Sequence, residues 1–170
     1  MKTKMIMLCL YLGSLGAFAQ HGNDGKNANK PLDQNMAMFK DAKLSVAYEH
    51  YVHVKDALVA SKGDEAKKGA IELQKALKNV NGSSSANKAA SDIAESVDLK
   101  VQRQAFSQLS NEMASLVKGG KLSMGILYLD YCPMANGNTG AYWLSNAKEI
   151  KNPYFGDKML KCGSVKEMIQ

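Results

Sequence analysis

The sequence predicts a mainly α-helical protein, an up-down bundle of about four helices that carries a small C-terminal cap of hairpin and loops. Three observations support this prediction. Apolar residues recur every three or four positions in four stretches between residues 36 and 118. Short breaks rich in glycine, serine and asparagine separate these stretches. After residue 120 the helical pattern stops, and the remaining segment contains two cysteines and the only tryptophan.

The first nineteen residues have the pattern of a secretory signal peptide. Lys2 and Lys4 precede an apolar run, and Ala17-Phe18-Ala19 forms a small-x-small cleavage site, so cleavage is expected after Ala19. The apolar run is too short to span a bilayer, and no later stretch qualifies, so no transmembrane span is expected in the mature chain. The product is therefore expected in the periplasm or outside the cell. Residues 20–35 are polar and predict a flexible tail.

Charge argues against a nucleic-acid-binding protein. Residues 1–19 contain two lysines and no acid, so their removal lowers the formal charge from +6 to +4. Lysines and acids are interspersed, and Arg103 is the only arginine, so no basic cluster is formed. The remaining segment, 36–170, is long enough for a single domain with its own core.

Two amphipathic helices are expected over residues 36–60 and 64–80. The inner face of the first is formed by Leu44, Tyr48, Tyr51, Val54 and Leu58. The inner face of the second is formed by Ala66, Ala70, Leu73, Leu77 and Val80. His50 and His53 lie three residues apart and away from the first stripe, so we expect them in solvent, where they could share a metal ion.

Two further helices are expected over residues 85–96 and 99–118. The third carries Ala86, Ala90, Ile93 and Val97 at helical spacing. The fourth carries Leu99, Phe106, Leu109, Met113 and Leu116. Asp98 is placed as the N-cap of the fourth helix, and Gly119-Gly120 as its stop.

The C-terminal third predicts a hairpin. Residues 122–131 are nearly all apolar or aromatic, and their periodicity is compatible with a buried strand or a short last helix. Residues 136–140 are a strong turn signal, and 141–144 can return as the partner strand. Residues 145–170 are expected to contain turns, a short helix near 156–161 and a final strand or tail.

Four sulfur-containing residues form the main candidate site. Cys132 and Met134 are two positions apart in an extended segment, whereas Met159 and Cys162 are three apart in a helical turn, so each pair shares a side. Thiolates and thioethers are soft ligands that favour Cu(I), and no histidine nearby completes a zinc site. The spacing alone leaves three alternatives open: a disulfide, a soft-metal site, or free buried thiols.

In the disulfide alternative, Cys132 and Cys162 would join in the oxidising compartment that an exported protein meets. The bond would close a loop of about 30 residues and contribute roughly 3–4 kcal/mol in the chain-entropy picture. The protein would then be a non-metal interaction module. Its candidate binding surface is aromatic and consists of Tyr142, Trp143, Tyr154 and Phe155. For Trp143, Tyr154 and Phe155, packing between the two cysteine segments is the favoured role.

No arrangement in the sequence indicates an enzyme. No serine–histidine–acid set or pair of carboxylates stands out, and the histidines lie outside the cysteine-containing third. A thiol oxidoreductase would show Cys-x-x-Cys, a motif that this chain lacks.

Four motifs resemble a known family. They are YCPMA at 131–135, GAYWLS at 140–145, EIKNPYFG at 149–156 and MLKCG at 159–163. Together with the helical spacing upstream, they resemble a bacterial domain-of-unknown-function family over roughly residues 40–168. That family occurs as small exported proteins and at the C-terminus of membrane-fusion (adaptor) proteins of heavy-metal efflux pumps. Cys132-Pro133-Met134 also looks like the Cys-Pro-Met of a short heavy-metal-binding domain, but Ala135-Asn136 follows here instead of His-Pro.

The resemblance implies a periplasmic accessory protein of copper or related heavy-metal handling. Cys132, Met134, Met159 and Cys162 match the family's sulfur positions, which implies a Cu(I) site formed by these four residues. An efflux adaptor protein is the implied partner.

Overall fold

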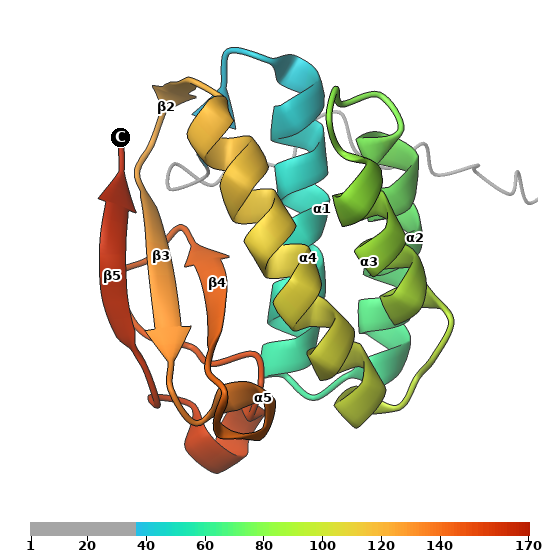
Figure 1. Cartoon of the computed structure of the whole chain (residues 1–170), viewed down its shortest axis with the longest axis vertical. Coiled ribbons are helices and arrows are strands. Elements are labelled where there is room, and N and C mark those ends of the chain that lie inside the picture. The colour runs from blue at the N-terminus through green and yellow to red at the C-terminus, as the bar shows by residue number, and fades with distance from the viewer. Residues whose placement is uncertain (1–36) are drawn as a thin grey trace, which may run out of the picture. The chain divides into compact units, whose positions relative to one another are not determined.

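Four long helices and two small antiparallel sheets make up residues 37–170, the part of the chain that the computed structural model describes. The helices are α1 Ala42–Val59, α2 Gly63–Leu77, α3 Ser84–Ala94 and α4 Leu99–Gly119. Consecutive helices pack against each other in an up-down arrangement, as predicted (Figure 1). Within these residues, no helix has the length and apolarity needed to cross a membrane. The predicted signal peptide and tail lie outside the described residues.

The C-terminal cap is a three-stranded antiparallel sheet in the order β4-β3-β5. Its strands are β3 Leu127–Cys132, β4 Ala141–Ser145 and β5 Ser164–Ile169. A second, two-stranded sheet pairs β1 Met38–Phe39 with β2 Leu122–Met124. Residues 122–124 and 127–131 are therefore in strands and not in a last helix, and the predicted hairpin with 141–144 is confirmed. Two short helical turns complete the cap, α5 Ala135–Asn138 and the 3₁₀ turn η1 Gly156–Met159.

The predicted boundaries of the first helix were wrong at its start. Met38 and Phe39 pair with β2, and the backbone N–H of Lys40 donates to the carbonyl of Lys121 at 2.8 Å, so this segment is extended. The helix begins after Asp41, whose carboxylate accepts from the N–H of Lys43 at 2.9 Å. Periodicity missed this boundary because Met38 and Phe39 fit a helical stripe as well as a strand.

The later helix boundaries are closer to the prediction. The second helix ends at Leu77 instead of residue 80, because turn bonds continue the chain through Val80, which stays buried. The third helix begins one residue earlier and ends two residues earlier than predicted. Asp98 caps α4 as expected, with its carboxylate accepting from the N–H groups of Lys100 and Val101 at 2.8 and 3.0 Å.

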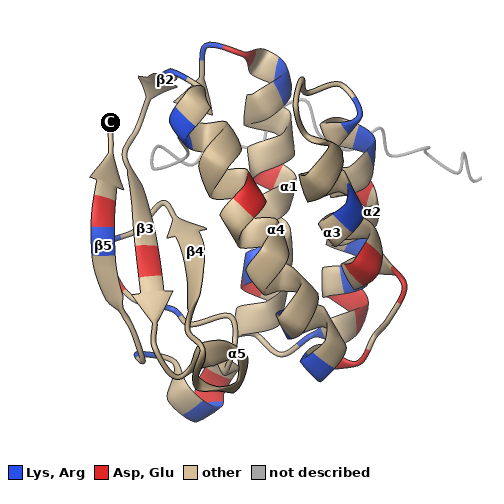
Figure 2. Ribbon diagram, in the orientation of Figure 1, with Lys and Arg blue, Asp and Glu red and all other residues tan. Residues whose placement is uncertain are grey.

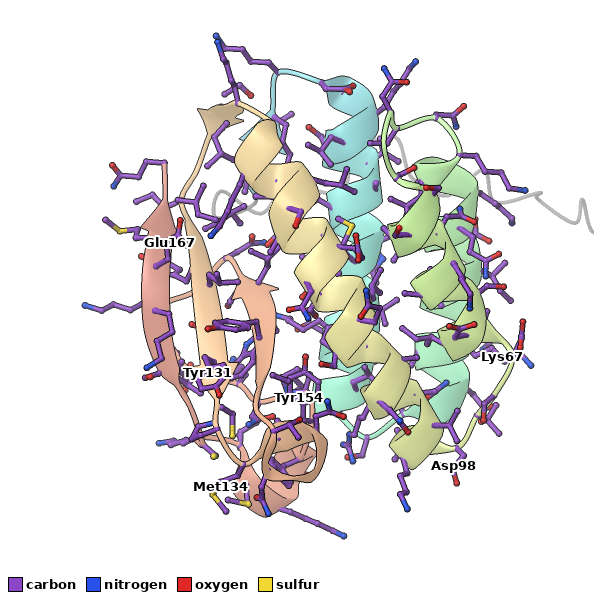
Figure 3. All side chains as sticks on the ribbon, in the orientation of Figure 1. Lys67, Asp98, Tyr131, Met134, Tyr154 and Glu167 are labelled. Atoms are coloured by element: carbon purple, nitrogen blue, oxygen red, sulfur yellow. The ribbon has the colours of Figure 1, made fainter. Side chains whose placement is uncertain are left out.

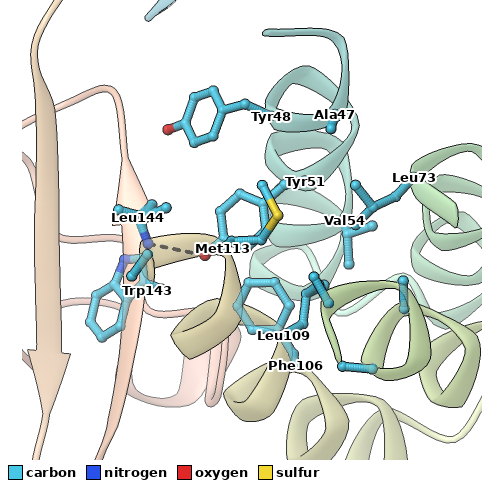
Figure 4. Packing of buried hydrophobic residues seen from close by; sticks show 14 of the residues in the cluster. Ala47, Tyr48, Tyr51, Val54, Leu73, Phe106, Leu109, Met113, Trp143 and Leu144 are labelled. Carbon is cyan, nitrogen blue, oxygen red and sulfur yellow. Dashed lines mark hydrogen bonds between the residues drawn. The ribbon is translucent and has the colours of Figure 1, made fainter. Parts of the chain in front are cut away.

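A row of buried aromatic rings joins the bundle to the cap. Tyr51 of α1 stacks on Phe106 of α4 with ring centroids 5.4 Å apart. Phe106 then contacts Tyr154 at 5.8 Å, and Tyr154 meets Trp143 of β4 edge-on at 6.0 Å. Such pairs add about 0.5–1.5 kcal/mol each beyond the area they bury. The row therefore positions the sheet on α1 and α4, and Figure 4 shows Tyr51, Phe106 and Trp143 of this row.

The Tyr51 hydroxyl is the polar link within this apolar contact. It lies 2.9 Å from the hydroxyl of Ser110 on α4 and accepts from the backbone N–H of Leu144 on β4 at 3.0 Å. Tyr51 is fully buried, and burial raises the pKa of its hydroxyl. One neutral side chain therefore satisfies polar groups on two other elements, as Figure 4 shows for the bond to Leu144.

Asp130, in the middle of β3, is an acidic group whose burial in the core opposes folding. It is 0% exposed, and neither carboxylate oxygen has a hydrogen-bond partner among residues 37–170. Trp143 lies directly across the β3–β4 ladder, and its buried indole N–H also lacks a partner within these residues. Burial raises the pKa of Asp130 to about 7, and the nearby Lys55 ammonium limits the rise. The carboxyl is therefore largely neutral below pH 7.

We predict that Tyr51→Phe lowers the free energy of unfolding by about 2 kcal/mol, because it leaves the Leu144 N–H and the Ser110 hydroxyl buried without this partner. Urea unfolding followed by circular dichroism measures the change. The matched control is Tyr128→Phe, because Tyr128 is a partly exposed tyrosine of β3 whose hydroxyl makes no hydrogen bond to residues 37–170. Equal stability of the two variants would contradict the role of the Tyr51 hydroxyl.

The second prediction concerns pH. The pKa of Asp130 is raised from 3.8 to about 7 on folding, so between these values the unfolded chain has released a proton that the folded chain retains. Stability therefore falls as pH rises from about 4 to about 7 and is then level, with a total loss on the order of 4 kcal/mol from this group. Asp130→Asn should remove this slope, and the exposed-site control Asp157→Asn should keep it. Urea unfolding at several pH values tests this; identical slopes in wild type and Asp130→Asn would refute it.

Candidate functional site

The structure brings the two cysteines of the cap into contact. Cys132 ends β3, and Cys162 lies just before β5. Because Tyr131 pairs with Ser164 in the β3–β5 ladder, the residues flanking that pair meet at the same end of the sheet. The two sulfur atoms lie 2.7 Å apart, Cys132 is 0% exposed, and Cys162 is partly exposed. A buried thiol and an accessible one therefore form a pair.

Gly163 makes this approach possible. Its φ of 141° lies in the region that favours glycine. A Cβ at this position would come within 2.7 Å of the Trp143 ring and 3.0 Å of the Tyr131 carbonyl oxygen. The chain between Cys162 and β5 therefore needs a residue without a side chain.

Asn152 fixes the segment that carries Cys162. Its side-chain amide donates to the carbonyl of Cys162 at 2.7 Å, and its side-chain oxygen accepts from the N–H of Tyr154 at 2.8 Å. Its backbone N–H donates to the carbonyl of Leu160 at 2.8 Å. Asn152 is fully buried, so these bonds are shielded from water. In the sequence, only the place of Asn152 in the EIKNPYFG motif marks this residue.

The geometry of the thiol pair limits its chemistry. A separation of 2.7 Å is longer than a disulfide bond of about 2.05 Å. Two sulfurs bound to one metal at about 2.3 Å and a tetrahedral angle lie about 3.8 Å apart. Oxidation therefore needs the sulfurs to approach slightly, whereas joint metal binding needs them to separate by about 1 Å.

Electrostatics keep the accessible sulfur protonated. The hydrogen bond with Cys132 and burial raise the pKa of the Cys162 thiol to about 11. A metal that binds the pair has to displace its protons, so binding would release protons.

The two methionines lie near the cysteines in the chain but not in hydrogen-bond contact with them. Met134 is 46% exposed beside α5 and is labelled in Figure 3. Met159 is partly buried, and its carbonyl accepts from the N–H of Cys162 at 3.0 Å, so both residues belong to one turn. Within residues 37–170, neither thiol hydrogen-bonds to a methionine sulfur. Of the four predicted ligands, the structure thus joins only the two cysteines directly.

Sites for harder metals receive less support. Among residues 37–170, no group of three or more His, Cys, Asp or Glu side chains is placed to hold a metal ion. His50 and His53 face each other on α1 with ring centroids 5.9 Å apart; His53 is exposed and His50 is half-buried. Burial, followed by the neighbouring His53, lowers the pKa of His50.

Two of the four residues in the alternative aromatic interaction surface are buried. Trp143 is 0% exposed and Tyr154 is 6% exposed, because both belong to the aromatic row of the core. Their burial fits the packing role that the sequence favours for them. Tyr142 is 38% exposed, its ring lies 4.6 Å from that of Tyr131, and its carbonyl accepts from the Tyr154 hydroxyl at 2.5 Å. Phe155 is partly buried.

Arg103 connects the cap to the bundle and was also missed as a positioning residue. Its Nε donates to the carbonyl of Pro153 at 2.9 Å. Its Nη2 donates to the carbonyl of Leu58 and to the hydroxyl of Ser61, both at 3.0 Å. The guanidinium therefore ties the loop before η1 to the end of α1, a task for which a planar group with several donors is suited.

Comparison with known proteins gives one match. Residues 47–125 match the sequence model of a family described as "Protein of unknown function (DUF3347)". No curated protein and no solved structure matches the chain. The matched segment extends from α1 to β2 and ends before the cysteine-containing cap. Over its helical bundle, the chain is therefore similar to a family of unknown function, in agreement with the kind of family that its motifs resemble.

Proposed function

We propose that this protein is an exported soft-metal-binding protein that holds Cu(I) between Cys132 and Cys162. The observation that carries the proposal is the contact between these two sulfurs, which are 2.7 Å apart in space and 30 positions apart in the chain. Met134 and Met159 would supply additional thioether ligands from the neighbouring turns. The family resemblance of the cap motifs to adaptor-linked domains supports the same proposal.

The ligand chemistry favours Cu(I) over other ions. Two thiolates and one or two thioethers form a soft donor set, whereas zinc requires four nitrogen, sulfur or carboxylate donors. Within the described residues, no third His, Cys, Asp or Glu joins the pair. A low coordination number of this kind suits Cu(I) and argues against zinc.

Access to the site would allow the ion to be passed on. Cys162 is partly exposed and Met134 is 46% exposed, so an incoming ligand can reach two of the proposed donors from solvent. Cys132 is fully buried and would hold the ion on the inner side. We propose that the ion moves by ligand exchange to a partner of the metal-efflux system, such as a membrane-fusion (adaptor) protein, in the periplasm. In this proposal the protein is a carrier or buffer and not an enzyme.

One observation favours a second candidate function. The 2.7 Å separation is closer to a disulfide than to a metal-bridged pair, and an exported chain meets oxidants. In that case Cys132 and Cys162 staple the cap, and the protein is an interaction module without metal. The two candidates differ in the native redox state of the two sulfurs.

The test is an anaerobic Cu(I) titration of the mature protein against a competing chelator, together with a thiol count. We expect two free thiols, counted after unfolding, and one tightly bound Cu(I) per chain. Cys132→Ser or Cys162→Ser should weaken Cu(I) binding by more than about 100-fold, because even outer-shell partners of metal ligands are worth 10- to 100-fold. Met134→Leu and Met159→Leu should each give a smaller loss, on the order of tenfold.

The matched control is Met124→Leu, which changes a methionine on β2 that is 61% exposed. It should leave Cu(I) affinity unchanged. If protein isolated from the periplasm has no reactive thiol and ignores Cu(I), the metal proposal fails and the disulfide-stapled module stands. If Met124→Leu weakens binding as much as Met159→Leu, the methionine assignment fails.

A further inference from the structure

We propose that the groove between the start of α4 and the α5–η1 side of the cap binds an acidic peptide segment of a partner protein. The groove has a volume of about 1000 Å³. Its walls come from Leu99, Lys100 and Arg103 on α4 and from Met134, Phe155 and Lys158 on the cap. This volume is at the upper end of ligand pockets and far exceeds what a single inorganic anion needs.

The charge of the groove selects an anionic partner. Lys100, Arg103 and Lys158 contribute three positive charges, and Figure 2 shows basic positions at the start of α4 and in the segment below α5. Asp98 is the one acid in the lining, and its carboxylate is already occupied by the N–H groups of Lys100 and Val101. The groove therefore carries a net positive charge that complements acidic side chains.

Arg103 is held in place before any partner binds. Its Nε and Nη2 are fixed by three acceptors on the loop before η1 and on the end of α1. Its Nη1 makes no hydrogen bond to residues 37–170 and is left to receive a carboxylate. A guanidinium that is already ordered loses little side-chain entropy when it binds, which favours a specific contact over a diffuse one.

Apolar side chains in the same groove indicate a peptide instead of a small anion. Leu99, Phe155 and the 46%-exposed Met134 lie among the basic residues. An extended segment with alternating acidic and apolar residues can engage both kinds of side chain, because successive side chains point to opposite sides.

The wall next to Met134 is a left-handed turn. Asn136, Gly137 and Asn138 have φ values of 51°, 67° and 67°. Two asparagines in this region are strained, and strained residues of this kind concentrate at ligand sites. The strain is an independent observation on the same groove and is consistent with a wall shaped for binding.

The test is fluorescence anisotropy with a fluorescein-labelled nonapeptide of alternating Glu, Asp and Leu residues, titrated with the mature full-length protein at low ionic strength. We expect saturable binding that weakens as salt is added. The double variant Lys100→Glu/Lys158→Glu should bind at least tenfold more weakly. The control Lys43→Glu/Lys67→Glu has the same net charge but changes residues on α1 and α2, and it should bind within twofold of wild type.

Three results would overturn the proposal: no saturable binding by the wild-type protein, equal weakening by both double variants, or displacement of the peptide by equimolar inorganic phosphate. Circular dichroism confirms that each variant is folded. The titration is repeated with Cys132→Ser/Cys162→Ser, which should keep peptide binding. The groove is thereby tested separately from the proposed Cu(I) function, and either can fail alone.

Discussion

The thiol pair and the groove both depend on the contact between Tyr51 and the C-terminal cap. Its ring continues the aromatic row through Phe106 to Tyr154, and its hydroxyl meets Ser110 and the backbone of Leu144. The aromatic row packs the sheet against α1 and α4. Arg103 adds hydrogen bonds to the same interface near the loop before η1. Because the thiol pair and the groove are both built by the cap, neither keeps its geometry if this interface opens.

The site itself follows from strand pairing more than from side-chain chemistry. The β3–β5 register places Tyr131 opposite Ser164, and this alone brings the flanking cysteine segments together. Gly163 then allows the chain to pass close to Trp143, and Asn152 holds the carbonyl of Cys162. The short motifs around the cysteines are therefore mainly structural: their glycine, asparagine and aromatic residues supply the turns and packing that position two sulfur atoms.

The sequence was sufficient for the bundle and only partly sufficient for the cap. Apolar periodicity located all four helices, and the Asp98 cap was confirmed, because helical spacing and capping are local signals.

Periodicity could not separate strand from helix at 122–131, nor exclude Met38–Phe39 from α1, because those assignments depend on partners far along the chain. The sequence left open whether Trp143 and Tyr154 pack or form a surface, because the contacts of Tyr154 with Phe106 and Trp143 depend on the tertiary fold. No local pattern in the sequence indicates that Asp130 is buried, because its burial results from the packing of the sheet on the helices.

The difference between local and distant contacts also orders the events of folding. The helices pack mainly on their neighbours in sequence, whereas the bond from Tyr51 to Leu144 joins residues 93 positions apart. Chains with local contacts close fast, and distant pairings form later because a long loop has to be ordered first. We therefore expect a period in which the bundle exists while the two thiols are still separate and open to solvent. If the proposed Cu(I) site is correct, a metal ion and an oxidant would compete for the open thiols in that interval, and kinetics as well as affinity would set the chemical form of the protein.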